Sequence, residues 1–296
     1  MFKKNKKLFT ILIFLFLIVF FYWQNHTLQI TRYELVYDNL PKSFDGYRIV
    51  QISDMHGKTF GKENIGLAKR IISLKPDILL ITGDMMSSTI NDEDAFLDFL
   101  DHFNKTCPIY MCLGNHEQIA GQLTSHGDNS RYSIFINNIR EKGVMLLDNE
   151  EISVKKGADS ITISGLTLEL YHYSRRDVEY YDENMSLTVS YMEAVLGKSQ
   201  GEFNILLAHN PSYFKEYVSW GADLILSGHM HGGIIRIPFW GGVFSPEKVL
   251  FPEYDAGLFE SGDSRMVVNR GLGYSKVNFR LFNRPEISFI VLKSGQ

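Results

Sequence analysis

The chain has 296 residues, of which 45% are hydrophobic and 22% charged, with a formal net charge of −4. This length permits a full hydrophobic core in one main domain, and the composition is that of a globular protein. Removing the four N-terminal lysines leaves a net charge of −8 with no later Lys/Arg cluster, which argues against a nucleic-acid partner.

The chain begins with a basic segment followed by an apolar one. Residues 1–7 contain four lysines, and residues 8–23 carry no charge. The pattern is typical of either a cleaved signal peptide or a retained anchor, and the run is shorter than the roughly 20 residues of an average spanning helix. We favour a single-pass anchor, because no small-x-small cleavage motif follows Trp23.

The lysines also predict the orientation of the chain. Positive charge on the short N-terminal side keeps that side in the cytoplasm, so the main domain is expected outside the cell membrane. The expected divisions are a cytoplasmic basic stub (1–7), a transmembrane anchor (8–23), a juxtamembrane segment (24–43) and the main domain (44–296).

Five apolar segments of strand length each run into polar residues and glycine. Helix-like stretches separate the first of them, and this alternation predicts parallel βαβ units. Ligands gather beyond the carboxyl ends of strands in such sheets. The polar residues after these segments are therefore expected to share one site. The segments are 47–53, 77–83, 108–114, 203–208 and 222–228.

The residues at these strand ends are of metal-binding types. Asp54 and Asp84 are each equally well explained as helix caps or turn residues, but their occurrence together with histidines favours ligands. Nitrogen and oxygen donors without a thiolate suit Mn, Fe or Zn and disfavour a closed structural zinc site. Seven such side chains are too many for one ion and fit two, as in phosphoryl transfer. The seven are Asp54, His56, Asp84, Asn115, His209, His229 and His231.

The stretch "GHMHGG" at residues 228–233 combines two histidines with three glycines. In an extended segment His229 and His231 would point the same way and reach toward one point, and the glycines allow a sharp turn close to a ligand. Taken alone, the stretch is equally well a polar loop.

Five motifs, in this order, resemble those of the calcineurin-like metallophosphoesterases, and the C-terminal part resembles a membrane-anchored bacterial branch of that family. The resemblance implies an α/β fold in which two mixed β-sheets pack as a sandwich flanked by helices (α/β/β/α), in addition to the N-terminal anchor. The motifs are "DMH" (54–56), "GD" (83–84), "GNHE" (114–117), "AHNP" (208–211) and "GHMH" (228–231).

The resemblance also implies a role for each candidate ligand. One divalent ion would be held by three of them and a second ion by three others, with Asp84 bridging the two. The two histidines of "GHMHGG" would then serve different ions. The first set is Asp54, His56 and His231, and the second is Asn115, His209 and His229.

Four residues are implied or considered as substrate contacts. In the family, the residue at the position of His116 stabilises or protonates the leaving oxygen, a role that needs an imidazole near the metals but not on them. Asn115 would contact the substrate together with His116. Arg175 and Arg176 would meet a substrate phosphate or an anionic surface, the alternative being an exposed loop.

The expected function is that of a membrane-anchored, two-metal phosphoesterase in which a metal-bridged hydroxide attacks a lipid or cell-envelope phosphodiester or pyrophosphate. The alternatives are a phosphomonoesterase or nuclease of the same fold, and a non-catalytic metal-binding scaffold. The aromatic segment 237–246 is either an apolar lip for a lipid tail or a loop tucked into the core.

Overall fold

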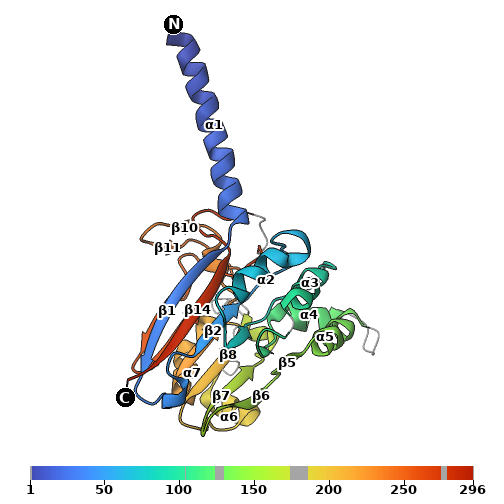
Figure 1. Ribbon diagram of the computed structural model, residues 1–296, viewed down its shortest axis with the longest axis vertical. Helices are drawn as coiled ribbons and strands as arrows, with labels where there is room; N and C mark the ends of the chain where they lie inside the picture. Colours follow the sequence, from blue (N-terminus) through green and yellow to red (C-terminus); the bar gives the residue numbers. More distant parts are fainter. Residues whose placement is uncertain (1, 104, 124–129, 174–185, 275–278, 296) are drawn as a thin grey trace.

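Two six-stranded mixed sheets pack face to face, with helices on their outer faces (Figure 1). The computed structural model of the protein describes residues 2–103, 105–123, 130–173, 186–274 and 279–295. The order of the first sheet is β1 (Gln29–Tyr37), β14 (Glu286–Ser294), β2 (Arg48–Ile52), β3 (Ile78–Ile81), β4 (Ile109–Met111) and β5 (Val144–Leu146). The order of the second is β12 (Gly257–Ser261), β13 (Ser264–Val268), β9 (Leu224–Ser227), β8 (Asn204–Ala208), β7 (Asp159–Leu166) and β6 (Glu150–Lys156).

The central strands are apolar throughout because both faces of each sheet are covered. In β3, Ile78 and Leu80 point into the core between the sheets, whereas Leu79 and Ile81 pack under the helices. The helices are α1 (Phe2–His26), α2 (Ile65–Ile72), α3 (Asp94–Phe103), α4 (Asn115–Leu123), α5 (Arg131–Glu141), α6 (Val189–Leu196) and α7 (Phe214–Trp220). The short 3₁₀ turns are η1 (Lys42–Phe44), η2 (Lys62–Asn64), η3 (Leu170–Tyr173), η5 (Pro211–Tyr213) and η6 (His231–Gly233), and a small hairpin joins β10 (Arg236–Ile237) to β11 (Gly241–Gly242).

The covering helices form because their apolar residues recur at helical spacing. In α3, Phe96, Phe99 and Phe103 are fully buried and lie on one face at intervals of three and four. These rings and the outer face of the first sheet form one apolar cluster, while α6 and α7 cover the second sheet in the same way. The four-layer α/β/β/α architecture is the one expected.

Strand β1 lies within residues 24–43, which were expected to be a juxtamembrane segment. It pairs in parallel with β14 along nine positions, from Gln29 with Glu286 to Tyr37 with Ser294. Leu35 and Tyr37 are buried between the sheets. The sheet therefore extends into the segment, a feature hidden in the sequence because the strand pairs with the distant C-terminus.

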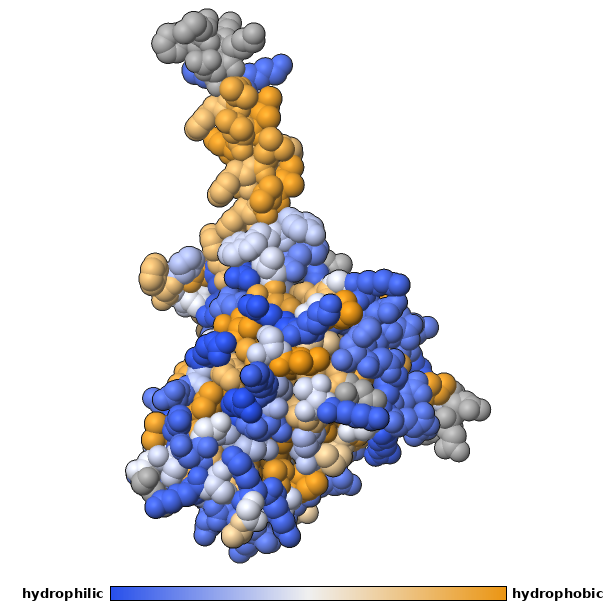
Figure 2. All heavy atoms as spheres, in the orientation of Figure 1, coloured by the Kyte–Doolittle hydropathy of each residue, from blue (hydrophilic) through white to orange (hydrophobic). Residues whose placement is uncertain are grey.

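Helix α1 projects from the domain as a single rod (Figure 1). Its part from Lys6 to His26 is long and apolar enough to cross a membrane, judged by length and composition. Figure 2 shows this rod as a hydrophobic column above a domain surface rich in hydrophilic residues. The helix leads into β1, so its base lies at one end of the first sheet.

Candidate active site

The carboxyl ends of central strands from both sheets meet at one edge of the sandwich. Asp54 follows β2, Asp84 follows β3 and Asn115 begins α4 just after β4, all in the first sheet. His209 follows β8, and the loop with His229 and His231 follows β9, both in the second sheet. The five strand ends thus bring all seven candidate ligands to the seam between the sheets.

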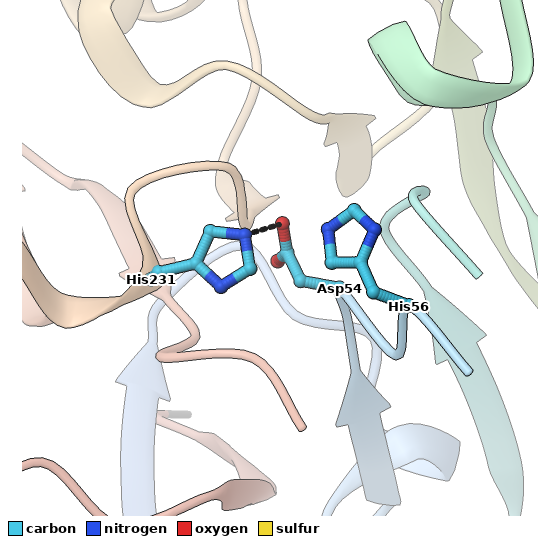
Figure 3. Close-up of side chains that lie close together, drawn as sticks. All are labelled: Asp54, His56 and His231. Carbon is cyan, nitrogen blue, oxygen red and sulfur yellow. Dashed lines mark ion pairs between the residues drawn. The ribbon is translucent and has the colours of Figure 1, made fainter. Parts of the chain in front are cut away.

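One group at this seam consists of Asp54, His56 and His231, whose candidate ligand atoms all lie within 4.8 Å of one another. Figure 3 shows the Asp54 carboxylate between the two imidazole rings, with the His231 Nε2 3.3 Å from the Asp54 Oδ1. The rings of His56 and His231 are stacked, with centroids 5.2 Å apart. Such separations are those of atoms that share one ion at bond lengths of about 2 Å.

A second group consists of Asp84, His209 and His229, and meets the same distance limit. The His209 Nε2 lies 3.1 Å from the Asp84 Oδ2. The His56 Nε2 lies 3.7 Å from that same oxygen. Asp84 therefore stands between the two groups.

A third grouping joins His56 and Asp84 to His116. The rings of His56 and His116 meet edge to face, with centroids 4.5 Å apart. His116 is held by two contacts: its backbone N donates to the Asp84 Oδ1 at 2.8 Å, and its ring Nδ1 accepts from the Ser88 N at 3.1 Å. With Nδ1 accepting, the neutral ring carries its proton on Nε2.

The interpretation of "GHMHGG" as an extended segment is wrong. His229 and His231 have φ angles of 66° and 48°, and η6 begins at the second of them. This left-handed backbone turns the two side chains apart, so His229 joins the group of Asp84 and His231 the group of Asp54. The division agrees with the one that the family resemblance implies.

Glycine is required where the strand ends approach each other. A Cβ on Gly228 would lie 1.9 Å from the Ser53 Oγ, and one on Gly114 would lie 2.2 Å from the Asp84 Oδ1. Both separations are shorter than any real contact of a Cβ atom. These two glycines are the residues through which the loops close on the aspartates.

Glu117 supports the site from beneath. Its buried carboxylate accepts hydrogen bonds from the backbone N of Asp84 at 2.9 Å, of Met85 at 2.6 Å and of Gly114 at 2.9 Å. Burial, with the nearby Asp84 adding to it, raises the pKa of Glu117 to about 7. The carboxylate thereby fixes the two loops that carry Asp84 and Asn115.

The buried ionisable groups of the site differ in the direction in which their pKa values are shifted. Burial disfavours the imidazolium of His209, but Asp84, Asp54 and the Thr82 carbonyl together outweigh burial and raise the pKa of His209 to about 10. Burial likewise opposes ionisation of Asp84, yet His209 and His116 hold its pKa well below the usual range. Burial lowers the pKa of His56 to about 3 and, more strongly than any other cause, lowers that of His231. The neutral rings of His56 and His231 are in the form that binds a metal ion, whereas Asp84 favours the charged form of His209.

The donor set fits divalent metal ions. Among the described residues of the two groups and their neighbour Asn115, the Asn115 Oδ1 and the His209 Nε2 are buried without a hydrogen-bond partner. Buried polar atoms of this kind require a partner, and both can bind a metal ion. An ion held by these residues would supply that partner.

The site opens into a cavity of about 660 Å³. His116 and Asn115, the two residues predicted to contact the substrate, lie in its wall. Three further wall residues were missed in the sequence because no motif contains them: Tyr173, Glu247 and Tyr274. The Glu247 Oε1 lies 3.2 Å from the His229 Nε2, and the Tyr173 ring meets that of His229 edge to face. Arg175 and Arg176 lie outside the described residues.

The profile of the calcineurin-like phosphoesterase family matches residues 47–233, the part of the chain that carries these ligands. The chain belongs to the calcineurin-like phosphoesterase family. The family depends on two metal ions, in agreement with the two groups of clustered Asp and His side chains. The expected resemblance is confirmed.

Three bacterial relatives show how far the similarity extends. The metallophosphoesterase YkuE of Bacillus subtilis (strain 168) is 29% identical over 280 residues, which cover 92% of this chain and 88% of that protein. The phosphodiesterase YaeI of Escherichia coli (strain K12) is 26% identical, with coverages of 83% and 82%. The UDP-2,3-diacylglucosamine pyrophosphatase LpxG of Chlamydia muridarum (strain MoPn / Nigg) is 28% identical, with coverages of 90% and 90%. This family member is accordingly a metal-dependent phosphoester hydrolase.

Proposed function

We propose that the protein is a membrane-anchored phosphodiesterase or pyrophosphohydrolase that acts on a phosphate ester of a lipid or cell-envelope head group. Helix α1 would be a single-pass anchor with its lysines in the cytoplasm and the catalytic domain on the extracytoplasmic side. Two divalent ions, of Mn, Fe or Zn, would occupy the site.

The observation that carries this proposal is the position of the site relative to α1. The helix ends at His26 and β1 begins at Gln29; β1 runs parallel to β14, and β14 runs antiparallel to β2. The carboxyl end of β2, which Asp54 follows, therefore lies at the end of the sheet where α1 joins the domain. A substrate held in the plane of a membrane would meet this end first.

One contact ties the anchor to the wall of the cavity. The Tyr274 hydroxyl accepts from the Lys58 Nζ at 2.8 Å and donates to the Asn25 carbonyl of α1 at 3.4 Å. Asn25 also receives the Arg280 backbone N on its Oδ1 at 2.8 Å. Helix α1 is thus joined to the site by direct hydrogen bonds, which supports a substrate at the membrane surface.

The ligand groups would hold the two ions. Asp54, His56 and His231 would bind one; Asn115, His209 and His229 would bind the other, with Asp84 shared. When bound, two divalent ions neutralise charge on a phosphoryl group and provide a nucleophile near neutral pH. A metal ion bound by His209 and Asp84 would take the place of the proton that Asp84 favours on this imidazole.

His116 would stabilise the leaving oxygen with a hydrogen bond from its Nε2. Its Nδ1 accepts from the Ser88 N, which places the ring proton on Nε2, and the residue lines the cavity. The contact of its backbone N with Asp84 keeps the ring beside the ligands. Removal of one hydrogen-bond donor to a developing oxyanion typically costs about 10²- to 10³-fold in rate.

The relatives support the two bond types in the proposal. YaeI is described as a phosphodiesterase, and LpxG as a pyrophosphatase of UDP-2,3-diacylglucosamine, a lipid-bearing substrate. Both are similar to this chain over more than four fifths of its length. A lipid or envelope phosphate is therefore the substrate class to test.

The test uses the full-length chain in detergent, stripped of metal and reloaded with Mn²⁺, Fe²⁺ or Zn²⁺ in parallel. Hydrolysis of bis-(p-nitrophenyl) phosphate is compared with that of p-nitrophenyl phosphate, and then a lipid pyrophosphate in mixed micelles is assayed. We expect chelator-sensitive cleavage of the diester or the lipid pyrophosphate in preference to the monoester.

Each other outcome counts against part of the proposal. Preference for the monoester would make the protein a phosphomonoesterase. Two bound metals without turnover of any of the three substrates would refute catalysis and favour a metal-binding scaffold.

A further inference from the structure

The tip of the β10–β11 hairpin consists of two aromatic residues that face solvent. Phe239 is 106% exposed and Trp240 77% exposed relative to fully accessible side chains. They belong to the segment 237–246, for which an apolar lip and a buried loop were both considered, and burial is excluded for these two rings. In Figure 2, hydrophobic atoms gather in the protrusion at the left of the helix base, where Figure 1 labels β10 and β11.

The backbone at this tip is unfavourable for the residue that it carries. The Trp240 N donates to the Ile237 carbonyl at 3.0 Å and closes a turn with Pro238 second and Phe239 third. Phe239 has a φ of 71°, a value for which this third position strongly favours glycine. Its ring makes no packing contact that offsets the strain, since it is fully exposed. A bulky apolar residue in such a place indicates a contact made outside the domain.

Phe282 connects this tip to the membrane helix. It is 47% exposed and lines the same surface hollow as Phe239 and Trp240. Its ring meets that of Phe20 on α1 edge to face, with centroids 5.8 Å apart. Phe20 lies within the uncharged run 8–23, about 9 Å along the helix axis before its end at His26. The hairpin is therefore level with the last apolar turns of α1.

Cationic side chains surround the same level. Arg236 and Arg270 line the same hollow as the two aromatic rings, Arg236 paired with Asp255 at 3.0 Å and Arg270 at 3.9 Å from Glu286. The Arg284 guanidinium lies over the ring of Trp23, a residue of α1, at 4.4 Å from the ring centroid. Aromatic rings with arginines beside them match the boundary between acyl chains and anionic head groups.

We propose that the turn Ile237–Trp240, together with Phe282, is a second membrane contact that enters the bilayer interface beside α1. The inference rests on the proposed function only in taking α1 as the membrane anchor. Two contacts fix the tilt of the domain, which a single helix with free rotation about its base does not. The cavity that contains His116 then keeps its opening toward the membrane surface.

The three tryptophans of the chain provide the test, since one lies at each relevant place. Trp23 reports on the end of the anchor and Trp240 on the hairpin. Trp220 ends α7, which precedes β9, so it lies at the edge of the second sheet opposite the metal groups. Full-length variants that retain one tryptophan each, with the other two changed to Phe, are reconstituted in bilayers with lipids brominated near the head group.

We expect the brominated lipids to quench Trp23 and Trp240 strongly and to leave the emission of Trp220 unchanged. Quenching of Trp23 without quenching of Trp240 would overturn the second contact while the anchor stands. Quenching of neither would refute the anchor as well, so the two failures are distinguishable.

Two of the single-tryptophan variants replace Trp220, which is buried and donates to the Gly197 carbonyl. A further variant that keeps Trp220 therefore guards against misfolding. Trp240→Phe alone, in the otherwise unchanged chain, alters an exposed side chain. The quenched part of the total emission should fall sharply in this variant, and an unchanged quenched part would contradict the proposal. Phe239→Ser is the companion variant, with which Trp240 should become less quenched.

Discussion

Asp54, His56, Asp84, His229 and His231 all have positive φ angles, between 43° and 66°. Residues other than glycine held in this region cost on the order of 1–3 kcal/mol each and cluster at functional sites. Hydrogen bonds hold the strained loops: the Asp54 N donates to the Gly83 carbonyl at 3.0 Å, and the Met55 N donates to the Asp84 carbonyl at 2.8 Å. The backbone conformations that orient the ligand side chains therefore lower the stability of the fold, and bound ions would restore part of that stability.

Asp84→Asn is the substitution that separates ligand charge from shape. The amide is nearly the same size and can still accept from the His116 N, but it removes the negative charge that both ions would share. We expect metal content to fall below two ions per chain and kcat/KM to drop by about 10³-fold or more, a loss of roughly 4 kcal/mol. Elemental analysis beside steady-state kinetics measures both.

The matched control for this variant is Asp77→Asn, which makes the same chemical change just before β3. Asp77 lies at the start of this strand, at the end of the sheet opposite the site. The control should retain both metals and turnover. Near-normal activity of Asp84→Asn would contradict the proposed mechanism.

His116→Ala tests the hydrogen-bond donor to the leaving oxygen separately from the metals. Its ring lies near the ligands, but it is assigned to neither ion in the proposed arrangement. The variant should bind two ions and lose about 10²- to 10³-fold in kcat, with a smaller loss for a diester whose leaving oxygen is already stable as an anion. Loss of a metal together with the rate would instead make His116 a ligand, through its grouping with His56 and Asp84.

At the scale of elements, an ion pair joins the starts of β2 and β3. The Asp77 carboxylate accepts from the Arg48 backbone N at 2.8 Å, and from its side-chain Nε and Nη2 at 3.1 and 3.0 Å. Partial burial opposes ionisation of Asp77, but these bonds outweigh it and lower its pKa. The pair is about a third exposed, so its contribution is modest.

Its pH dependence follows from the lowered pKa. Asp77 stabilises the fold fully above its unfolded pKa of about 4, and the contribution is lost as the pH falls through the lower folded value. Asp77→Asn should therefore reduce stability by about 0.5–1 kcal/mol at pH 7, or about 1–4 °C in Tm. Thermal unfolding at pH 7 and pH 3 measures this, and the difference from the unaltered chain should shrink at pH 3. A constant difference would mean that the charge is not the cause.

The elements that sequence alone predicted are those with local signals. The buried runs that became β2, β3, β4, β8 and β9 are continuous and apolar, and the motifs after them fall at their ends. Strands β1, β12 and β14 could not be predicted from local sequence, because their pairing depends on partners far along the chain. Glu247 and Tyr274 escaped for the same reason: only the fold brings them to the cavity.

At the scale of the whole molecule, helix α1 continues into strand β1 of the catalytic domain. Strand β1 connects α1 directly to the first sheet, so a cut at residue 44, the expected start of the main domain, would remove this edge strand together with the buried Leu35 and Tyr37. A cut at residue 28 would remove α1 and keep the strand. The two truncations differ by a single sheet-forming segment and test where the domain begins.

The chain starting at residue 44 should aggregate, and the one starting at residue 28 should fold. Without β1, the space filled by Leu35 and Tyr37 between the sheets opens to water, and the Phe203 ring that meets Tyr37 is uncovered. Newly exposed apolar surface of this kind promotes aggregation. The chain starting at 28 keeps β1 but loses the contacts of α1 with Tyr274, Arg280, Phe282 and Arg284, so it should melt a few degrees lower and still cleave a soluble diester. Size-exclusion chromatography and circular dichroism compare the two. If the shorter chain stays monomeric with an unchanged melting curve, β1 does not contribute to the stability of the domain. The inference that β1 fixes α1 relative to the site would then be wrong.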